Sequence, residues 1–194
     1  MDALLAVEDK RFYSHGGVDW IGMGRAVWTS ARAGRVVSGG STITMQPARL
    51  LEPRPKRTIS AKVIEMWRAH QLEWRLSKQE ILELYLTLAP YGGYIEGVRA
   101  ASWRYFGREP DRLSDDQIAL LIALPQSPEV RRPDLHPKGA RAGRAEIVTK
   151  LERHGFLTKQ RAYEARAASL PKKRYAFPNR AWHATTSAAR DVQS

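Results

Sequence analysis

Helix-start signals recur along this sequence, and they constrain its fold more than any other feature. Ser77 is followed three residues later by Glu80, which is the capping-box pattern, and the apolar run over 81–88 comes directly after it. Ser114 and Gln117 repeat the pattern before a second apolar run that Pro125 ends. The sequence therefore predicts at least two well-capped helices.

Further helices are indicated by apolar spacing and by one more cap. Between residues 60 and 76 the apolar side chains recur every three to five residues, which favours an amphipathic helix over a strand. Thr158 precedes a helical stretch over 159–168, whereas strand-like alternation is confined to a short stretch at Val36 and Val37. We expect a mainly α domain over 1–170, followed by a basic tail or linker over 171–194 that leads toward a further domain.

Length and cysteine content exclude several classes of protein. The chain has 194 residues, enough for one ordinary core, and no cysteine, which excludes thiol catalysis, zinc ribbons and disulfides. Its longest apolar run, 118–125, is far shorter than the roughly 20 residues that span a bilayer, and no signal-peptide pattern opens the chain. We therefore expect a chain without its own anchor or signal peptide.

Positive charge is unevenly distributed. The net charge is +12, of which +10 lies in residues 131–194 and +2 in residues 1–130. A second basic concentration lies between Trp20 and Lys62, where eight Lys or Arg residues accompany one acid, Glu52. It is a candidate anion site, and the alternative is a solvated basic face.

Carboxylates offer the best candidates for chemistry, since the sequence has no metal-binding box and no Ser/His/Asp arrangement. Glu8 and Asp9 lie between apolar and aromatic neighbours, an environment that raises a carboxyl pKa toward the range of a general base. The alternative is a helix-end acid paired with Lys10 or Arg11. Lys62 and Glu65, three residues apart, share one helix face and can act on one ligand, or they form an ordinary surface ion pair.

A third candidate is the polar segment 39–46. It supplies hydroxyls, backbone N–H groups and an amide immediately before a helical stretch, which suits phosphate or sugar hydroxyls. Its alternative is a Ser/Thr helix cap.

Five segments in order along the chain resemble the motifs of glycosyltransferase family 51, the peptidoglycan transglycosylase domain of class A penicillin-binding proteins. They are AVEDKRFYSHGGVD (6–19), GGSTITMQ (39–46), RTISAKVIE (57–65) with SKQEILELYL (77–86), YGG (91–93) through AASWRYFG (100–107), and LIALPQSP (121–128). Met45 and the run 48–51 are similar to the penicillin-binding protein 1C subgroup. Three residues depart from the family pattern: Pro47, which we expect to kink a helix, Ala61 and Thr87.

The resemblance implies a lysozyme-like helical fold with a larger lobe and a small membrane-facing lobe. It also implies polymerisation of lipid II into β-1,4-linked glycan strands with release of undecaprenyl diphosphate, at the periplasmic face of the bacterial inner membrane. The expected partners are lipid II, the growing glycan strand and the membrane surface, with moenomycin as inhibitor and no nucleic acid. No cofactor is required, although the resemblance allows a divalent ion, Mg²⁺ or Mn²⁺, near Glu65.

Residue roles follow from the same resemblance. Glu8 is expected to be the general base, and Glu65 to organise the diphosphate site as the second catalytic residue. The expected substrate-binding residues are Asp9, Phe12, His15, Ser41, Thr42, Gln46, Arg49, Arg57 and Lys62. A lysozyme-like glycan hydrolase and a truncated, inactive transglycosylase remnant remain as alternatives.

The segment that begins at Trp20 is the candidate membrane contact. Trp20, Val27 and Trp28 interleave there with Arg25 and Arg32, which suits a helix resting on an anionic bilayer. A helix that faces the core is the alternative.

Overall fold

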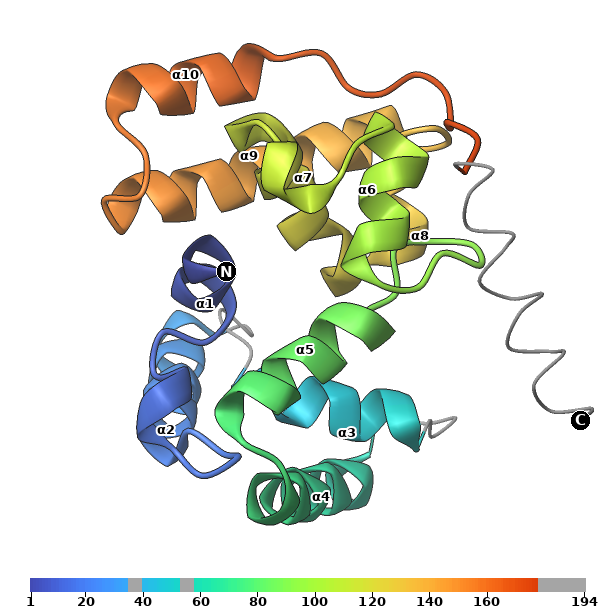
Figure 1. Ribbon diagram of the computed structural model, residues 1–194. Helices are drawn as coiled ribbons and strands as arrows, with labels where there is room; N and C mark the ends of the chain where they lie inside the picture. Colours follow the sequence, from blue (N-terminus) through green and yellow to red (C-terminus); the bar gives the residue numbers. More distant parts are fainter. Residues whose placement is uncertain (35–39, 53–57, 178–194) are drawn as a thin grey trace, which may run out of the picture.

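The computed structural model describes residues 1–34, 40–52 and 58–177, and within these ranges the protein is helical (Figure 1). Extended pairing in the described residues is limited to one isolated antiparallel bridge between Pro90 and Glu96. The prediction of a mainly α fold is confirmed. The candidate strand at Val36 and Val37 lies outside the described residues.

The first half of the chain contains α1 (Asp2–Glu8), η1 (Phe12–Ser14), α2 (Trp20–Ala33), α3 (Met45–Leu51), α4 (Ile59–Arg75) and α5 (Lys78–Leu88). The second half contains α6 (Val98–Phe106), η2 (Pro110–Arg112), α7 (Asp115–Ala123), η3 (Leu124–Gln126), α8 (Pro128–Arg131), α9 (Pro137–Arg153) and α10 (Lys159–Ala167). Here η denotes a short 3₁₀ helix.

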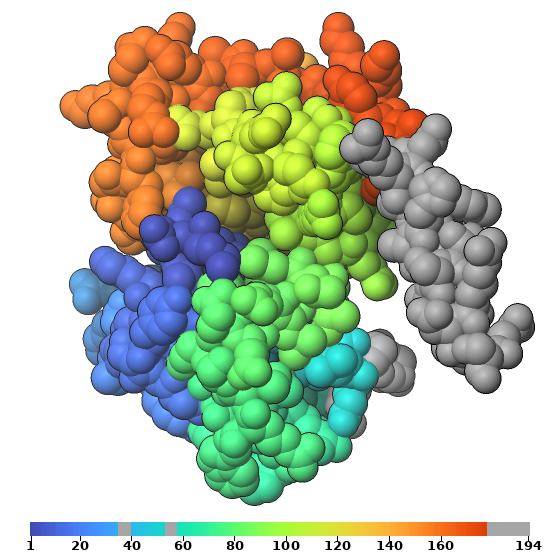
Figure 2. Space-filling model, in the orientation of Figure 1, coloured from blue at the N-terminus to red at the C-terminus, as the bar shows by residue number. Residues whose placement is uncertain are grey.

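Two cores of unequal size divide the molecule into a larger and a smaller lobe. In the larger lobe α7, α8 and α10 pack around α9, and α1 also contacts α9 (Figure 1). The smaller core consists of Val18, Met45 and Ala69, with Met23 and Met66 beside it, where α3 packs on α4. Figure 2 shows the blue-to-green first half below and the yellow-to-red second half above, in contact through α1 and α5. The expected large and small lobes are therefore present.

The predicted caps form. The Ser77 N–H donates to Glu80 Oε2 at 2.7 Å, and the Glu80 N–H donates back to Ser77 Oγ at 3.3 Å, which completes the capping box of α5. The Ser114 N–H donates to the side chain of Gln117 at 3.3 Å. Thr158 accepts from the Arg161 N–H at the start of α10. Local sequence therefore sets these helix starts.

Pro47 stands in the first turn of α3, where the physical reason for the expected kink is missing. It is the third residue of α3, whose N-cap is Thr44. The N–H of a residue at this position would have had no partner inside the helix, and its i−4 residue, Ile43, lies before the helix begins. The proline therefore costs no hydrogen bond, and its ring is buried in the fold.

The tryptophans of α2 and α4 face outward, whereas Met23 and Met66 pack beside the small core. On α2, Trp20 and Trp28 are more than half exposed and Ala26 is buried, which contradicts a core-facing helix. On α4, Val63 and Trp67 are also more than half exposed, although their spacing resembles that of a buried stripe. The small core is covered by α3 on another side of α4, where Ala69 is fully buried.

Residues 171–177 lie against the domain. Arg174 pairs with Asp134, with Nε and Oδ2 2.9 Å apart, and the Tyr175 N–H donates to the Arg104 carbonyl at 2.8 Å. The domain boundary near residue 170 stays a prediction. Among the described residues, no helix combines the length and apolar character needed to cross a bilayer.

Candidate active site

Glu8 is a partly buried carboxylate held by two side-chain amides. It is the last residue of α1. Its Oε1 accepts from Gln126 Nε2 at 2.6 Å, and its Oε2 accepts from Gln46 Nε2 at 3.3 Å. Burial raises the pKa of Glu8 above its usual value, although the two amides, Lys150 and Arg131 oppose that rise. A carboxylate of this kind is suited to accept a proton near neutral pH.

Asp9, the residue after Glu8, bonds to two other segments of the chain, at His15 and at Ile43. Its carboxylate oxygens lie 3.0 and 3.1 Å from His15 Nε2, and Oδ2 also accepts from the Ile43 N–H at 2.9 Å. Both the Asp9 and His15 side chains are almost fully buried. These contacts hold the loop after Glu8 against the segment that precedes α3.

Phe12 also lies behind the site. Its ring is 1% exposed, and the Lys78 ammonium lies 4.5 Å from the ring centroid. The predicted direct substrate contact of Phe12 is therefore at odds with its place in the core. The residue instead holds the turn that follows Glu8.

The segment that precedes α3 is anchored by Thr42. The Thr42 hydroxyl donates to the Gly17 carbonyl and accepts from the Met45 N–H at 3.2 Å. Gly17 has φ +98°, and a Cβ there would lie 2.9 Å from the Ala69 carbonyl carbon, so the loop can pass α4 this closely because the residue is glycine. Thr42 therefore acts as a helix-cap residue, which was the alternative interpretation of segment 39–46. It also lines the cavity that contains Glu8.

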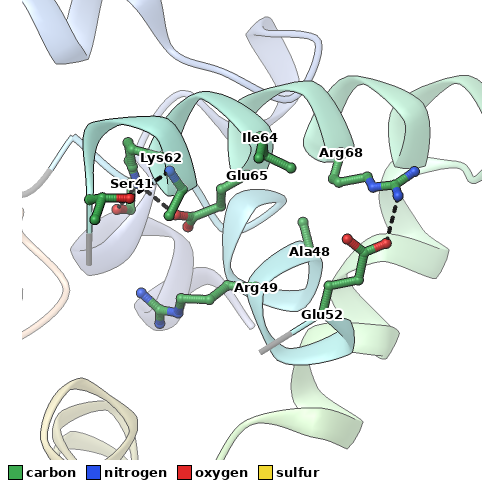
Figure 3. Close-up of a pocket in the computed structure, with 10 residues that line it drawn as sticks. Ser41, Ala48, Arg49, Glu52, Lys62, Ile64, Glu65 and Arg68 are labelled. Atoms are coloured by element: carbon green, nitrogen blue, oxygen red, sulfur yellow. Dashed lines mark hydrogen bonds and ion pairs between the residues drawn. The ribbon is translucent and has the colours of Figure 1, made fainter. Parts of the chain in front are cut away.

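Lys62 and Glu65 form the second centre, on the first turns of α4 (Figure 3). Lys62 Nζ donates to Ser41 Oγ at 2.8 Å and to Glu65 Oε2 at 3.3 Å. They line a cavity of about 260 Å³ together with Arg49 of α3, which lies below them in Figure 3. At the opposite end, Arg68 pairs with Glu52 at 2.8 Å. The predicted pairing of Lys62 and Glu65 is present, and both side chains border a cavity.

Ser41 connects the two centres. A second cavity, of about 360 Å³, is lined by Glu8, Asp9, Thr42 and Ser41 and is flanked by α2. Ser41 also lines the Lys62 cavity, so the two cavities adjoin at this residue. A ligand lying across Ser41 would meet the Glu8 carboxylate on one side and Lys62 and Arg49 on the other.

The surroundings of Glu65 bear on the predicted divalent ion. No cluster of three His, Cys, Asp or Glu side chains that could hold a metal ion occurs in the part of the chain that the structure describes. Glu65 Oε2 already faces the Lys62 ammonium, which a divalent ion would have to displace. Glu65 Oε1 is buried and has no hydrogen-bond partner in the structure. Mg²⁺ or Mn²⁺ near Glu65 stays a prediction, and no step below uses one.

Three residues singled out in the sequence, Arg57, Ala61 and Thr87, differ in what the structure shows of them. Arg57 lies outside the described residues. Ala61 lines the Lys62 cavity, whereas Thr87 bonds the Glu83 carbonyl on an exposed part of α5. Sequence reasoning did not identify Gln126 or Arg131 as site residues, although Gln126 belongs to the fifth motif.

Comparison with known proteins gives consistent matches. Penicillin-binding protein 1C from Escherichia coli K12 is 46% identical over 166 residues, which covers 86% of this chain and 21% of that protein. Penicillin-binding protein 1A from Aquifex aeolicus is 38% identical over 85% of this chain and 23% of that protein, and penicillin-binding protein 1A from E. coli K12 is 36% identical over 87% and 20%. The chain therefore spans about a fifth of the length of these relatives.

A solved structure of penicillin-binding protein 1A from Haemophilus influenzae overlaps 69% of this chain and 17% of its own chain. The identity is 24% and the TM-score is 0.47. The family model described as transglycosylase matches residues 1–152. With the motif order, this match and the 46% identity to a 1C protein, the chain belongs to the transglycosylase family found in class A penicillin-binding proteins.

Proposed function

We propose that this domain is a peptidoglycan glycosyltransferase that polymerises lipid II into β-1,4-linked glycan strands. The observation that carries the proposal is the pair of adjoining cavities, one with the partly buried Glu8 carboxylate and one with Lys62 and Arg49. An alcohol nucleophile needs a base, and a diphosphate leaving group needs cations. The first cavity supplies the base and the second supplies cations, and Lys10, Arg11 and Arg25 add positive charge to the lining of the first.

In the proposed step, Glu8 takes the proton from the 4-hydroxyl of one GlcNAc. The oxygen forms a bond to the anomeric carbon of the lipid-linked chain, and the bond from that carbon to the diphosphate oxygen breaks with inversion. Undecaprenyl diphosphate leaves with the electron pair. Lys62 and Arg49 stabilise its developing charge, because cations aimed at that charge act more strongly in a cleft than in bulk water.

Neighbouring polar groups position the substrate. Ser41 and Thr42 line the Glu8 cavity and suit sugar or phosphate oxygens, while Gln46 holds Glu8 Oε2. Glu65 orients the Lys62 ammonium through their 3.3 Å contact. This arrangement favours a transferase over a lysozyme-like hydrolase, whose substrate carries no diphosphate and gives the cation cavity nothing to bind.

Incubation with labelled lipid II tests the proposal. We expect glycan polymer that moenomycin suppresses. Short hydrolysis products would support a hydrolase instead, and binding of lipid II without any turnover would support an inactive remnant. The Glu8→Gln protein serves as the catalytic blank.

The small lobe supplies the membrane contact in the same proposal. The exposed residues of α2 and α4 include four tryptophans, of which Trp67 and Trp74 pack edge to face with centroids 6.2 Å apart. Tryptophans on an exposed apolar surface, with Arg25 and Arg32 nearby, suit an anionic bilayer interface. We place this surface on the periplasmic face of the bacterial inner membrane, where the lipid-linked substrate would be presented.

Vesicle binding tests the membrane contact. We expect binding to anionic vesicles that weakens as salt is added, and further weakening in Trp28→Ser and Trp67→Ser. Tyr163→Ser is the matched control, since Tyr163 is an equally exposed aromatic residue on α10 in the other lobe. Equal losses in all three variants would contradict a specific surface on α2 and α4.

A further inference from the structure

Gln126 reaches the candidate base from the other end of the chain. It is the last residue of η3 and lies 118 residues from Glu8 in sequence, yet its Nε2 is 2.6 Å from Glu8 Oε1. The Gln46 contact to Glu8 Oε2 is longer, at 3.3 Å. Of the two amides on this carboxylate, Gln126 makes the closer contact.

Arg131 fixes the orientation of the Gln126 amide. Arg131 Nη1 donates to Gln126 Oε1 at 2.6 Å and to the Ala123 carbonyl at 3.0 Å. A guanidinium can only donate, so the oxygen of the amide must face Arg131 and its NH₂ group must face Glu8. The direction of the hydrogen bond to Glu8 is therefore set by chemistry.

Arg131 is itself held from α9. Its Nη2 donates to Glu146 Oε2 at 3.3 Å, and Glu146 Oε1 lies 2.9 Å from Lys150 Nζ. Gly143 lets α9 pass close to Arg131, because a Cβ at this position would lie 2.8 Å from Arg131 Cδ. The chain of contacts runs from α9 through Arg131 and Gln126 to Glu8, so a rigid helix supports the carboxylate.

We infer that Gln126, held by Arg131, is a positioning residue that aims the Glu8 carboxylate and stabilises its charged form in the proposed glycosyl transfer. The inference rests on the proposed function for the reaction it serves. Its physical basis is that a neutral donor steadies the carboxylate without the full charge pairing that would make it a poor base. Arg131 acts one group away and polarises the amide between them.

The other groups around Glu8 are consistent with this role. The cations that act on it are Arg131 of α8 and Lys150 of α9, and α3 presents the neutral amide of Gln46. Tyr85 of α5 also faces this region, and burial raises the pKa of its hydroxyl well above the usual value, so it stays neutral. The Gln126 hydrogen bond is the strongest of the influences that lower the pKa of Glu8 against the effect of burial.

The experiment measures the titration of Glu8 directly and the pH profile of polymerisation in parallel. In the full chain with ¹³C-labelled Glu carboxyls, the Glu8 signal is identified by its absence in Glu8→Gln. Gln126→Met removes the donor at similar length, Gln126→Glu replaces it with an acceptor of the same shape, and Arg131→Lys loosens the amide. Gln160→Met is the control, because it breaks an amide–carboxylate contact of the same 2.6 Å length, to Glu164, on the exposed α10.

We expect the titration midpoint of Glu8 to rise by about one pH unit in Gln126→Met, and to rise in Gln126→Glu as well. The acidic limb of kcat should move upward by the same amount. At pH 7, where Glu8 is still largely ionised, kcat should fall roughly tenfold because the carboxylate is no longer aimed, with KM changing less than about twofold. Gln160→Met should match wild type, and Arg131→Lys should give a smaller shift than Gln126→Met. A purely structural Gln126 would instead lower the unfolding temperature and leave the titration unmoved.

An unchanged Glu8 midpoint in both Gln126 variants would overturn the inference. Thermal unfolding identifies any variant that has lost its fold. If Gln126→Met is unfolded, the Glu8 midpoint in the isosteric Gln126→Glu decides the inference, since Arg131 can still pair with the new carboxylate. If wild-type protein makes no polymer, the proposed function fails, whereas the carboxyl titration still decides whether Gln126 controls Glu8.

Discussion

The surroundings of Glu8 and Glu65 differ in kind, although both are glutamates beside a cavity in the same cleft region. Both side chains are partly buried, but Glu8 meets two neutral amides, with Arg131 and Lys150 acting from farther away. Glu65 instead faces the Lys62 ammonium directly at 3.3 Å. Identical side chains are thus prepared for different tasks.

The difference shows how neighbours divide the chemistry. A carboxylate that must take up a proton needs an environment that does not pair its charge fully, which neutral amides and burial provide. A carboxylate that must hold a lysine in place needs that lysine next to it. The comparison predicts separable effects on turnover and on binding.

The largest expected effect follows loss of the base. Glu8→Gln keeps the shape of the side chain and removes its basicity, so polymer formation should fall by roughly a hundredfold to ten-thousandfold. The measurement is the initial rate of polymer formation from labelled lipid II. Near wild-type polymerisation by this variant would remove Glu8 from the role of base and break the comparison.

Removal of the cation from the second cavity should have the next largest effect. In Lys62→Met the leaving diphosphate loses a donor, and kcat/KM should fall by roughly a hundredfold. Glu65→Gln should give a smaller loss, about tenfold, that affects binding and turnover together, because it releases Lys62 rather than removing it. Arg99→Met is the control, since it breaks an exposed ion pair with Glu109. A loss in Arg99→Met equal to that in Lys62→Met would show that any lost cation has this effect.

The pH dependence of wild type sharpens the comparison with a smaller effect. The base must be ionised to act, and burial raises the pKa of Glu8 above 4.5, the usual value of a Glu carboxyl. The rate should therefore decline as the pH falls, with an acidic limb centred above pH 4.5. A pH profile of kcat/KM measures this limb. A limb centred at or below pH 4.5 would contradict the raised pKa.

The smallest expected effect concerns Pro47, whose helix also carries Gln46 and Arg49. Because Pro47 stands in the first turn of α3 and costs no hydrogen bond, Pro47→Leu should bring no stabilisation. The added freedom of the unfolded chain should lower the free energy of unfolding by about 0.4–1 kcal/mol. Denaturant unfolding measures it, and a clear gain in stability would restore the kinked helix that the sequence suggested.

Local patterns in the sequence predicted local structure well. The capping boxes at Ser77 and Ser114 and the three-residue spacing of Lys62 and Glu65 act within one or two helical turns, so spacing was sufficient. Pro47 shows the limit of that approach. Its effect depends on which residue begins the helix, and sequence patterns place helix boundaries poorly.

Features that depend on packing were beyond reach of the sequence. Periodicity marked an apolar stripe with Val63 and Trp67 but could not tell whether another helix covers it. The contact of Gln126 with Glu8 spans 118 residues. It depends on α1 and α8 both packing against α9, with η3 next to α8. Phe12 was placed among substrate contacts by its motif, whereas the fold puts its ring in the core.

The central claim is that Glu8 supplies the base, whereas Lys62 binds the diphosphate and stabilises its developing charge. It is tested most directly by the affinity for lipid II in proteins that cannot turn it over. Equilibrium binding is measured for Glu8→Gln and for the double variant Glu8→Gln/Lys62→Met. The account predicts that Glu8→Gln binds lipid II and that the added Lys62→Met change weakens binding roughly tenfold or more. Absence of binding by Glu8→Gln, or equal affinity of the two proteins, would contradict it.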